Sequence, residues 1–339
     1  MAKEYAVAVV GAGMVGKKMV EILLERNFPM KSLTILATRE RRETIAGREF
    51  NVRVADERAF QGTDIAFFAG TEGEKGAGKA FARAAVAAGS LVIDNGADFR
   101  MEPEVPLVIP EVNPHHLSQD RRLIANPNCS TIQMVVALAP IHREFKLQAV
   151  IASTYQAVSG TGSKAADELR EQITAIERKT AVINNIYPRQ IAFNLIPHIG
   201  SLSAEYPGSY TEEVKMIHET RKILDCPRLP VSATCVRVPV YNAHSETVTV
   251  QCEREPDAGR VRELLAGSPG IRVMDDPAAG IYPVPLDCSG KDEVFVGRIR
   301  KNTCMDRAID LWIVADNIRK GAALNAVQIA EEILRRNYI

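Results

Sequence analysis

One cysteine in the sequence stands where a thiol can become reactive. Cys129 lies in the segment Asn-Pro-Asn-Cys-Ser-Thr at 126–131, after the apolar run 123–125 and before residues at helical spacing. Asn128 is a suitable N-cap, so Cys129 would lie in the first turn of a helix. There the helix dipole lowers a thiol pKa below its ordinary value of about 8.5 and favours the thiolate. Placement alone leaves two interpretations open, a nucleophile or a structural residue.

The other cysteines show no pattern of this kind. They lie far apart, with no C-x-x-C pair and no histidine at metal-ligand spacing beside them. We therefore expect free thiols in a reducing compartment and no metal site. These cysteines are Cys226, Cys235, Cys252, Cys288 and Cys304.

A glycine-rich segment near the N-terminus has the spacing of a dinucleotide-binding turn. Residues 11–16 read Gly-Ala-Gly-Met-Val-Gly, between the apolar run 5–10 and a helical pattern. In such a strand-to-helix turn, backbone N–H groups and the helix N-terminus bind a pyrophosphate. The predicted cofactor contacts here are Gly11, Gly13, Met14, Val15 and Gly16.

The residues after the next apolar run indicate which nicotinamide cofactor is bound. An acidic residue there typically binds the ribose 2′-hydroxyl of NAD. Residues 37–42 instead read Ala-Thr-Arg-Glu-Arg-Arg, and cations suit the 2′-phosphate of NADP. We therefore expect NADP, with Thr38 and Arg39 in contact with it. The alternative is that these arginines are solvated loop charges, and Glu40 leaves NAD open.

The elements that position these residues predict two domains. Short apolar runs and helical segments alternate up to 128, which is typical of an α/β, doubly wound parallel sheet. From 147 onward, longer β-like runs and two helical segments predict an antiparallel or mixed sheet with helices on one face. The β-like runs are 147–158, 190–199, 231–240, 245–253, 294–300 and 309–315, and the helical segments are about 163–180 and 211–224. The expected parts are a dinucleotide-binding domain at 1–128, an α+β catalytic and dimerisation domain at 129–317, and a C-terminal helix at 318–339 returning to the first domain.

Composition excludes several classes of protein. The 339 residues suit two domains, and 42 Lys+Arg balance 42 Asp+Glu. Zero net charge argues against a general nucleic-acid binder or a polybasic membrane-surface protein. No stretch approaches the roughly 18 apolar residues of a membrane helix, and the N-terminus lacks a signal-peptide core. We expect a cytoplasmic protein whose partners are small molecules or copies of itself, not nucleic acid or membrane.

Several motifs, in order along the chain, resemble the aspartate-β-semialdehyde dehydrogenase family. Beside 126–131, the segment Ser-Thr-Tyr-Gln-Ala-Val-Ser-Gly at 153–160 matches that family. The resemblance covers essentially the whole chain and implies a fold like that of glyceraldehyde-3-phosphate dehydrogenase, as a homodimer. Further matching segments are 191–197, 212–215, 237–240, 244–246 and 316–323.

The resemblance implies a specific oxidoreductase. It would convert L-aspartyl-4-phosphate to L-aspartate 4-semialdehyde with NADPH, reversibly and with inorganic phosphate as the other substrate. The reaction belongs to the biosynthesis of lysine (through diaminopimelate), threonine, methionine and isoleucine. Cys129 would be the nucleophile that forms a thioester, and His244 the acid/base group. Without the motif, His244 would more often be a hydrogen-bonding turn residue, in competition with His142, His198 and His218.

Two further residues are assigned to the substrate by the same resemblance. Gln156 would orient the covalent intermediate, and Arg237 would bind the α-carboxylate bidentately. Arg237 could also be a strand-edge arginine paired with a carboxylate. An interval of seven residues would oppose Arg237 and His244 on one continuous strand, but Pro239 and Asn242 predict a break between them.

The remaining family positions concern phosphate, the substrate ammonium and the cofactor. Arg100 and Lys215 match phosphate contacts, one from each domain, which predicts a cleft between the domains. Glu212 matches the ammonium contact, although Glu213 is adjacent and Glu212 with Lys215 could be only an i,i+3 ion pair. Asn128 is counted with the substrate contacts. The predicted cofactor-side residues are Ser159, Gly160, Gly162 and Asn317, the last holding the nicotinamide amide.

Two alternatives stay open at this point. N-acetyl-γ-glutamyl-phosphate reductase shares the two-domain plan and the chemistry, but its cysteine segment differs from 126–131. A catalytically silent relative would keep the fold for assembly or regulation. The joint presence of Cys129, Gln156, Arg237 and His244 opposes the silent relative, since such a protein does not need all four.

Overall fold

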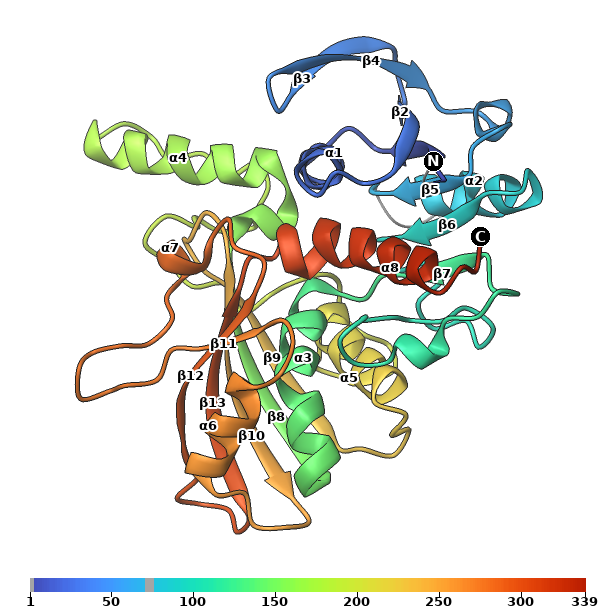
Figure 1. The fold of residues 1–339 in the computed structure, drawn as a ribbon. Helices are drawn as coiled ribbons and strands as arrows, with labels where there is room; N and C mark the ends of the chain where they lie inside the picture. Colours follow the sequence, from blue (N-terminus) through green and yellow to red (C-terminus); the bar gives the residue numbers. More distant parts are fainter. Residues whose placement is uncertain (1–2, 71–75) are drawn as a thin grey trace. The chain divides into compact units, whose positions relative to one another are not determined.

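The computed structural model describes residues 3–70 and 76–339, which form two compact units. The first unit comprises the described residues up to Asn128 together with Ala322–Ile339, and the second comprises Cys129–Gly321. Each unit has its own β-sheet with helices packed on it (Figure 1). The predicted two-domain α/β fold is confirmed. None of the helices in the described ranges is long and apolar enough to cross a membrane.

The first unit contains the predicted parallel sheet. Its seven strands lie in the order β3-β4-β2-β1-β5-β6-β7, and every neighbouring pair is parallel except β3 with β4. The sheet therefore needs helices on both faces to bury its apolar strands. Its strands are β1 (Tyr5–Val10), β2 (Met30–Ala37), β3 (Arg41–Ile45), β4 (Arg48–Val54), β5 (Ile65–Phe68), β6 (Leu91–Asp94) and β7 (Leu123–Ala125).

Helices cover both faces of this sheet. They are α1 (Met14–Glu25), α2 (Ala77–Ala87), α8 (Leu324–Arg335) and the 3₁₀ turns Glu57–Phe60 and Pro114–His116. Because strand side chains alternate, Val7, Val9 and Phe67 enter a core with α1 and α8. Phe68 points the other way and stacks on Phe60 beside α2, with ring centroids 5.7 Å apart. The C-terminal helix α8 is thus part of the first unit's core.

The hairpin β3–β4 was not expected from the sequence. Ala46 and Gly47 form its turn, with φ of 49° and 73°, the left-handed backbone that suits a two-residue hairpin turn. Arg41 and Arg42 consequently lie on strand β3 rather than on a loop. Arg41 Nε donates to Glu43 Oε1 at 2.7 Å, so this arginine is engaged within the hairpin.

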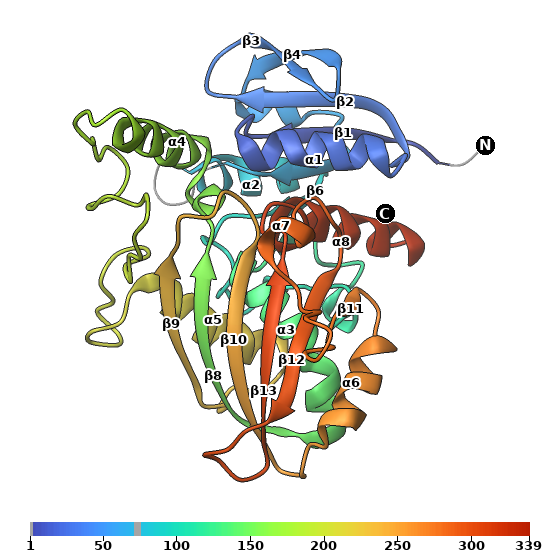
Figure 2. The ribbon, with the colours of Figure 1, turned by 90° about the vertical axis from the view of Figure 1, so that its left-hand side faces the viewer.

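The second unit has a mixed sheet with helices on one face, as predicted. Six strands lie in the order β11-β12-β13-β10-β8-β9, and only β8–β9 and β11–β12 are parallel (Figure 2). The strands are β8 (Leu147–Gln156), β9 (Val231–Arg237), β10 (His244–Cys252), β11 (Ile271–Val273), β12 (Val294–Lys301) and β13 (Ala308–Ala315). The helices are α3 (Cys129–Phe145), α4 (Ser163–Glu177), α5 (Thr211–Ile223), α6 (Ala258–Ala266) and α7 (Pro285–Cys288), with a 3₁₀ turn at Val158–Thr161 and a π-helical turn at Arg319–Ala323. Helices α3 and α5 lie behind the sheet in Figure 2 and pack on β8, β9 and β10.

The predicted β-run at 190–199 is wrong. This segment forms turns, and its one bridge joins Ile196 to Arg237 through backbone bonds of 2.9 and 3.0 Å. Phe193 has a φ of 59°, and Pro197 has no N–H to donate to a neighbouring strand. The apolar segment 190–199 therefore lies over the end of β9 but does not add a strand to the sheet.

Candidate active site

Three predicted site residues lie in one row at the end of the second unit's sheet. Gln156, the last residue of β8, pairs with Arg237, the last residue of β9. Thr154 pairs with Glu246, and side chains two positions apart on a strand share a face, so Gln156 and His244 also lie side by side. All three site residues are at most 5% exposed. The register thus brings them together from three strands.

The predicted break between Arg237 and His244 is present. Strand β9 ends at Arg237, β10 begins at His244, and β8 lies between these two strands. The odd interval in sequence therefore does not oppose the two side chains, because they do not belong to one strand.

A backbone hydrogen bond fixes the tautomer of His244. The N–H of Ala157 donates to Nδ1 at 2.9 Å, so the proton of the neutral ring is assigned to Nε2. Nε2 is buried and has no partner among the described residues. Burial lowers the pKa of His244 well below its ordinary value of 6.5, and the positive charge of Arg237 lowers it further. His244 therefore offers a neutral ring with an N–H at Nε2.

Arg237 and Gly160 lie beside this ring. One guanidinium nitrogen of Arg237 donates to the carbonyl of Ala157 at 2.7 Å, and its Nε is buried without a partner in the described ranges. A Cβ added to Gly160 would lie 3.0 Å from a guanidinium nitrogen of Arg237 and 3.1 Å from Nε2 of His244. The family motif assigned Gly160 to the cofactor, and in the structure it lies against the two buried basic side chains, Arg237 and His244.

Gln156 connects the row to the two helices above the sheet. Its Nε2 donates to Ser130 Oγ of α3 at 2.6 Å and to Glu212 Oε1 of α5 at 2.9 Å. Its Oε1 is buried without a partner in the part of the chain described. Lys215 lies one turn along α5, with Nζ 3.9 Å from Glu212 Oε2. The predicted Gln156, Glu212 and Lys215 therefore lie together.

The two adjacent glutamates of α5 have different surroundings. Glu213 accepts from the N–H of Tyr210 at 2.8 Å and from the N–H of Cys235 at 3.1 Å, so its two oxygens cap the helix and join it to β9. Glu212 instead contacts Gln156. This difference favours Glu212 over Glu213 as the residue available to a substrate.

Cys129 is the first residue of α3 and is partly exposed. A Cβ on Gly321 would lie 3.0 Å from Cβ of Cys129, so a larger residue there would force Cys129 or its neighbour to shift by a few tenths of an ångström. Ser130, the partner of Gln156, follows directly in the chain. The second unit therefore places Cys129 on the helix that covers the row of Arg237, Gln156 and His244.

The glycine-rich turn of the first unit has the shape of a phosphate cradle. Gly11 has a φ of 107°, and a Cβ there would lie 2.8 Å from the backbone of Ala69. A Cβ on Gly16 would lie 1.7 Å from the carbonyl oxygen of Gly11. Gly13 has open space around it and directly precedes α1, which begins at Met14. A pyrophosphate fits this turn, because backbone N–H groups at a helix N-terminus are open to it.

Two family models match the chain, one for each unit. The semialdehyde dehydrogenase NAD binding domain matches residues 6–120, and the semialdehyde dehydrogenase dimerisation domain matches 138–320. Aspartate-semialdehyde dehydrogenases of Aquifex aeolicus and Bacillus subtilis are 47% and 44% identical to it, with 99% or more of each chain covered. The chain belongs to the aspartate-semialdehyde dehydrogenase family.

A solved family member has the same fold. The aspartate semialdehyde dehydrogenase II of Vibrio cholerae, in a structure described as complexed with ASA, has a TM-score of 0.93 and 40% identity. The comparison covers 98% of this chain and 99% of that one. The resemblance inferred from the motifs is confirmed.

Most of the remaining cysteines of this chain differ from Cys129 in burial, although Cys226 is partly exposed as Cys129 is. Cys235, Cys252 and Cys288 are buried, and burial raises the pKa of Cys252 to about 11 and that of Cys288 to about 12. Burial also raises the pKa of Cys226, while Cys304 is exposed. Burial raises the pKa of Cys235 as well, and thiols with raised pKa values are poor nucleophiles at neutral pH, which sets these four cysteines apart from a reactive one.

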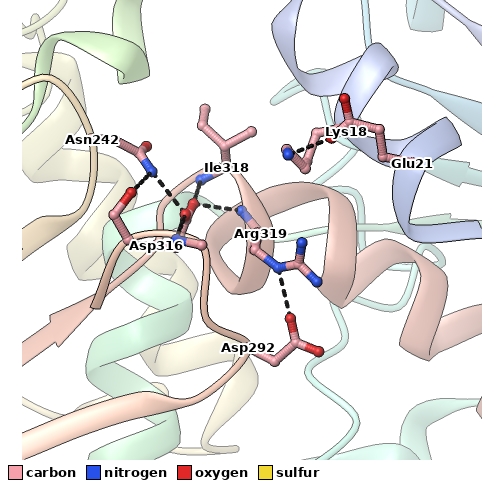
Figure 3. Close-up of polar contacts among 9 residues, drawn as sticks. Lys18, Glu21, Asn242, Asp292, Asp316, Ile318 and Arg319 are labelled. Carbon is pink, nitrogen blue, oxygen red and sulfur yellow. Dashed lines mark hydrogen bonds and ion pairs between the residues drawn. The ribbon is translucent and has the colours of Figure 1, made fainter. Parts of the chain in front are cut away.

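Asp316, the first residue of the family segment 316–323, joins three loops through hydrogen bonds (Figure 3). One carboxylate oxygen accepts from the N–H groups of Ile318 and Arg319, each at 2.9 Å. The other accepts from Nδ2 of Asn242 and from the N–H of Gly290, each at 2.7 Å. Asp316 therefore fixes the turn before β10 as well as the segment after β13.

Asn317 completes this attachment. Its Oδ1 accepts from the N–H of Ala243 at 3.0 Å, and its Nδ2 donates to Ser159 Oγ at 2.9 Å. Ala243 has a φ of 70°, a strained backbone directly before His244. The predicted Ser159 and Asn317 thus lie together, and they hold the turn that presents His244. Their contacts with a cofactor stay predictions.

The other predicted cofactor and phosphate residues lie apart from this cluster in the chain. Thr38 and Arg39 are exposed after β2, and Arg39 makes no hydrogen bond or ion pair within 3–70 and 76–339. Arg100 is 6% exposed, and its guanidinium donates to the carbonyls of Asn126 at 2.9 Å and Asn95 at 2.7 Å. Their roles toward ligands stay predictions.

The same holds for Asn128, which is buried in the first unit. Gly162 precedes α4 with a φ of 104°, and a Cβ added there would meet open space. Three residues of the site were missed by the sequence reasoning: Ser130, Gln133 and Glu246. Gln133 lies four positions from Cys129 on one helix face and Glu246 two positions from His244 on one strand face, so these spacings could have pointed to them, whereas Ser130, adjacent to Cys129, has no such signal.

Proposed function

We propose that this chain catalyses the reversible reduction of L-aspartyl-4-phosphate to L-aspartate 4-semialdehyde and phosphate, with NADPH as the reductant. The observation that carries the proposal is the row of Arg237, Gln156 and His244 beneath the helix that begins at Cys129. Two curated relatives at 44% and 47% identity carry the name of this enzyme, and a solved relative at 40% identity is described as complexed with ASA. The reaction would serve the synthesis of lysine, threonine, methionine and isoleucine.

In the first step, the thiolate of Cys129 forms a bond to the acyl carbon of aspartyl phosphate. The bond between that carbon and the phosphate oxygen breaks, phosphate leaves, and a thioester remains. Arg237 would bind the substrate α-carboxylate, since its Nε is buried without a partner in the described part of the chain. Gln156 would offer its Oε1 for one uncharged hydrogen bond, and Glu212 would accept from the substrate ammonium.

The second step returns the thiolate. NADPH, when bound, supplies the hydride that reduces the thioester carbon. Cleavage of the carbon–sulfur bond then gives the aldehyde and leaves the electron pair on Cys129, so neither step consumes a proton at that sulfur. His244, expected as an acid/base group, would act through Nε2–H by donating a hydrogen bond to the substrate oxygen while negative charge develops there.

Phosphate and cofactor contacts are proposed from the remaining cations. Lys215 lies one turn from Glu212 and would bind the phosphate that leaves or attacks. Arg100, in the first unit, is kept as a proposed phosphate-binding residue because of the family motif. Thr38 and Arg39 follow the end of β2, and exposed cations there favour NADP over NAD. The open space at Gly13 supports pyrophosphate binding at the N-terminus of α1.

We also propose that the chain forms a homodimer through its second unit. The matching family model is a dimerisation domain, and helices α3, α5 and α6 lie on one face of the mixed sheet, while the short helix α7 packs against β13 at the end of the other face. That face presents Ile151, which is 46% exposed, and the ring pair Tyr155 and Trp312. Light scattering on the purified protein would give twice the mass of one chain.

The decisive assay measures NADP reduction with L-aspartate 4-semialdehyde, with and without phosphate. Activity should require phosphate and should be lost in Cys129→Ala. A matched control is Cys304→Ala, which changes an exposed cysteine elsewhere in the second unit and should leave the activity unchanged. Activity with N-acetylglutamate 5-semialdehyde instead would support the alternative reductase. The absence of activity with both would support a silent relative.

A further inference from the structure

Glu246 is a buried carboxyl group directly below the proposed catalytic row. It follows His244 by two positions on β10, so the two side chains lie on the same face of the sheet. Its backbone neighbours in register are Thr154 on β8 and Ile313 on β13. The side chain has no exposed surface. The mechanism above gives it no role.

If Glu246 carries a negative charge, several polar atoms around it lack a hydrogen-bond partner. Neither of its carboxylate oxygens has a hydrogen-bond partner within the described ranges, and the same holds for Gln133 Oε1 and Thr154 Oγ1. The amide of Gln133 and the hydroxyl of Ser130 face Glu246 closely enough to stabilise its charged form, yet neither makes a hydrogen bond of normal geometry with it. An unpaired buried carboxylate is among the most costly groups in a protein interior.

A neutral carboxylic acid resolves this arrangement. It has one O–H donor and one carbonyl acceptor, so it can pair with the amide of Gln133 whichever way that amide is turned. A carboxylate could only accept, which leaves Gln133 Oε1 without a donor. Burial raises the pKa of Glu246 well above its ordinary value, and the charge of Glu212 raises it further.

The groups that face Glu246 come from every neighbouring element. None of them is a cation that would compensate a negative charge. They are Ser130 and Gln133 on α3, Glu212 on α5, Thr154 on β8, Cys235 on β9, His244 on its own strand and the apolar Ile313 on β13.

The two residues of α3 near Glu246 both touch the catalytic row. Gln133 Nε2 donates to the carbonyl oxygen of His244 at 3.4 Å, and Ser130 Oγ accepts from Gln156 at 2.6 Å. Helix α3 begins at Cys129, one residue before Ser130 and four before Gln133. Glu246 is therefore placed where it can hold the first turns of this helix against β10.

We propose that Glu246 is a positioning residue that acts as a neutral carboxylic acid and holds Ser130 and Gln133, and with them Cys129, in place relative to His244 and Gln156. It does not touch the substrate. The inference deepens the proposed function and rests on it only for the kinetic consequence. The protonation state of Glu246 follows from the structure of the second unit alone.

The protonation state has a direct spectroscopic test. The infrared difference spectrum between the unsubstituted protein and Glu246→Gln at neutral pH should contain the carbonyl band of a protonated carboxylic acid. Carboxylate bands in that difference spectrum would overturn the proposal. This readout does not depend on activity, so it stands even if the proposed reaction is not observed.

Thermal unfolding gives an independent measure with a defined sign. A folded-state pKa above the ordinary 4.5 means that the unfolded chain ionises Glu246 first as pH rises, so the contribution of this carboxyl group to stability falls with rising pH, and Glu246→Gln lacks that pH-dependent contribution. The Gln variant should therefore gain in Tm relative to the unsubstituted protein from about pH 5 to about pH 8, by about 3 °C or more. A constant difference in Tm would contradict the proposal.

A second buried glutamate supplies the matched control. Glu168 on α4 accepts from the N–H groups of Asn185 at 2.7 Å, Ile186 at 2.5 Å and Tyr187 at 3.3 Å, so its carboxylate is satisfied as an ion. Glu168→Gln places an amide against these N–H donors and should lower Tm throughout the pH range. If both Gln variants change Tm alike, Glu246 is not distinguished by its protonation.

Kinetics separates positioning from a merely structural role. Glu246→Gln keeps a donor and an acceptor and should retain kcat within about threefold, whereas Glu246→Leu should lower kcat by about tenfold or more with little change in KM. Equal loss of kcat in the Gln and Leu variants would contradict the proposal. If the Leu variant does not fold, the infrared and unfolding results on the Gln variant still decide the question.

Discussion

Replacement of Gly160 by alanine tests whether the loop after β8 and the two buried bases form one rigid arrangement. The added methyl group would lie 3.0 Å from a guanidinium nitrogen of Arg237 and 3.1 Å from Nε2 of His244, about 0.4 and 0.3 Å short of the 3.4 Å at which ordinary contact begins. Gly160 does not have a positive φ, so alanine introduces no backbone strain there. Any change in activity in Gly160→Ala should therefore come from displacement of Arg237 and His244 and not from strain in the main chain.

The size of the effect follows from this overlap. Arg237 and His244 are held by hydrogen bonds to the carbonyl and the N–H of Ala157, at 2.7 and 2.9 Å, so a shift of either side chain would strain those bonds. A misplacement of 1 Å at a reacting group lowers rates by about 100-fold, so a shift of a few tenths of an ångström should lower kcat/KM by about tenfold. That loss corresponds to about 1.4 kcal/mol in activation free energy. We expect an accompanying loss of about 1 kcal/mol in unfolding free energy from overpacking.

The assay compares Gly160→Ala with Gly267→Ala in phosphate-dependent NADP reduction. Gly267 ends α6, has a negative φ and would place its Cβ 3.6 Å from the nearest atom, an ordinary contact. The Gly267 variant should keep kcat/KM within about twofold. A Gly160 variant with unchanged kcat/KM would refute the reasoning, because the methyl group could then be accommodated without disturbing either base.

Three further outcomes follow from the same geometry. Arg237→Lys should raise KM for aspartate semialdehyde by about tenfold or more with a smaller effect on kcat, because a single ammonium cannot bind a carboxylate bidentately; an unchanged KM would contradict this role. The lowered pKa of His244 means that stability is lost as pH falls below about 6.5, by up to about 1.4 kcal/mol per pH unit, and denaturant titrations of His244→Gln should show a shallower loss between about pH 6.5 and pH 5. Arg39→Ala should raise KM for NADP at least about fivefold and leave KM for NAD unchanged, and equal effects on the two cofactors would disprove the assignment of Arg39 to the 2′-phosphate.

Local patterns were sufficient to predict the elements that carry the site. The apolar run, glycine turn and helix around Gly11 and Gly16 follow from backbone rules, and Cys129 at a helix start follows from its flanking residues. The hairpin β3–β4 was missed because its charged, alternating sequence resembles a loop, and only the left-handed turn at Ala46 and Gly47 marks it. The run 190–199 was misassigned because apolar content alone does not supply a partner strand.

The arrangement of the site depended on register, which local patterns do not specify. Arg237, Gln156 and His244 form one row because β8 lies between β9 and β10, an order set by the packing of the whole sheet. The interval of seven residues between Arg237 and His244 therefore did not decide whether they lie side by side; the strands that they belong to did. Glu246 was recognised as part of a motif, but its role could be inferred only after its unpartnered oxygens and its neighbours on α3 were known.

The central claim, a thioester on Cys129, has a direct measurement. The protein is mixed with aspartate semialdehyde and NADP in the absence of phosphate, so that the acyl group cannot be transferred onward, and is then quenched in acid and digested. Mass spectrometry should find one aspartyl group on the peptide that contains Cys129, and that group should disappear when phosphate is added before the quench. An acyl group on another cysteine, or none on any peptide while NADP is reduced, would contradict the account.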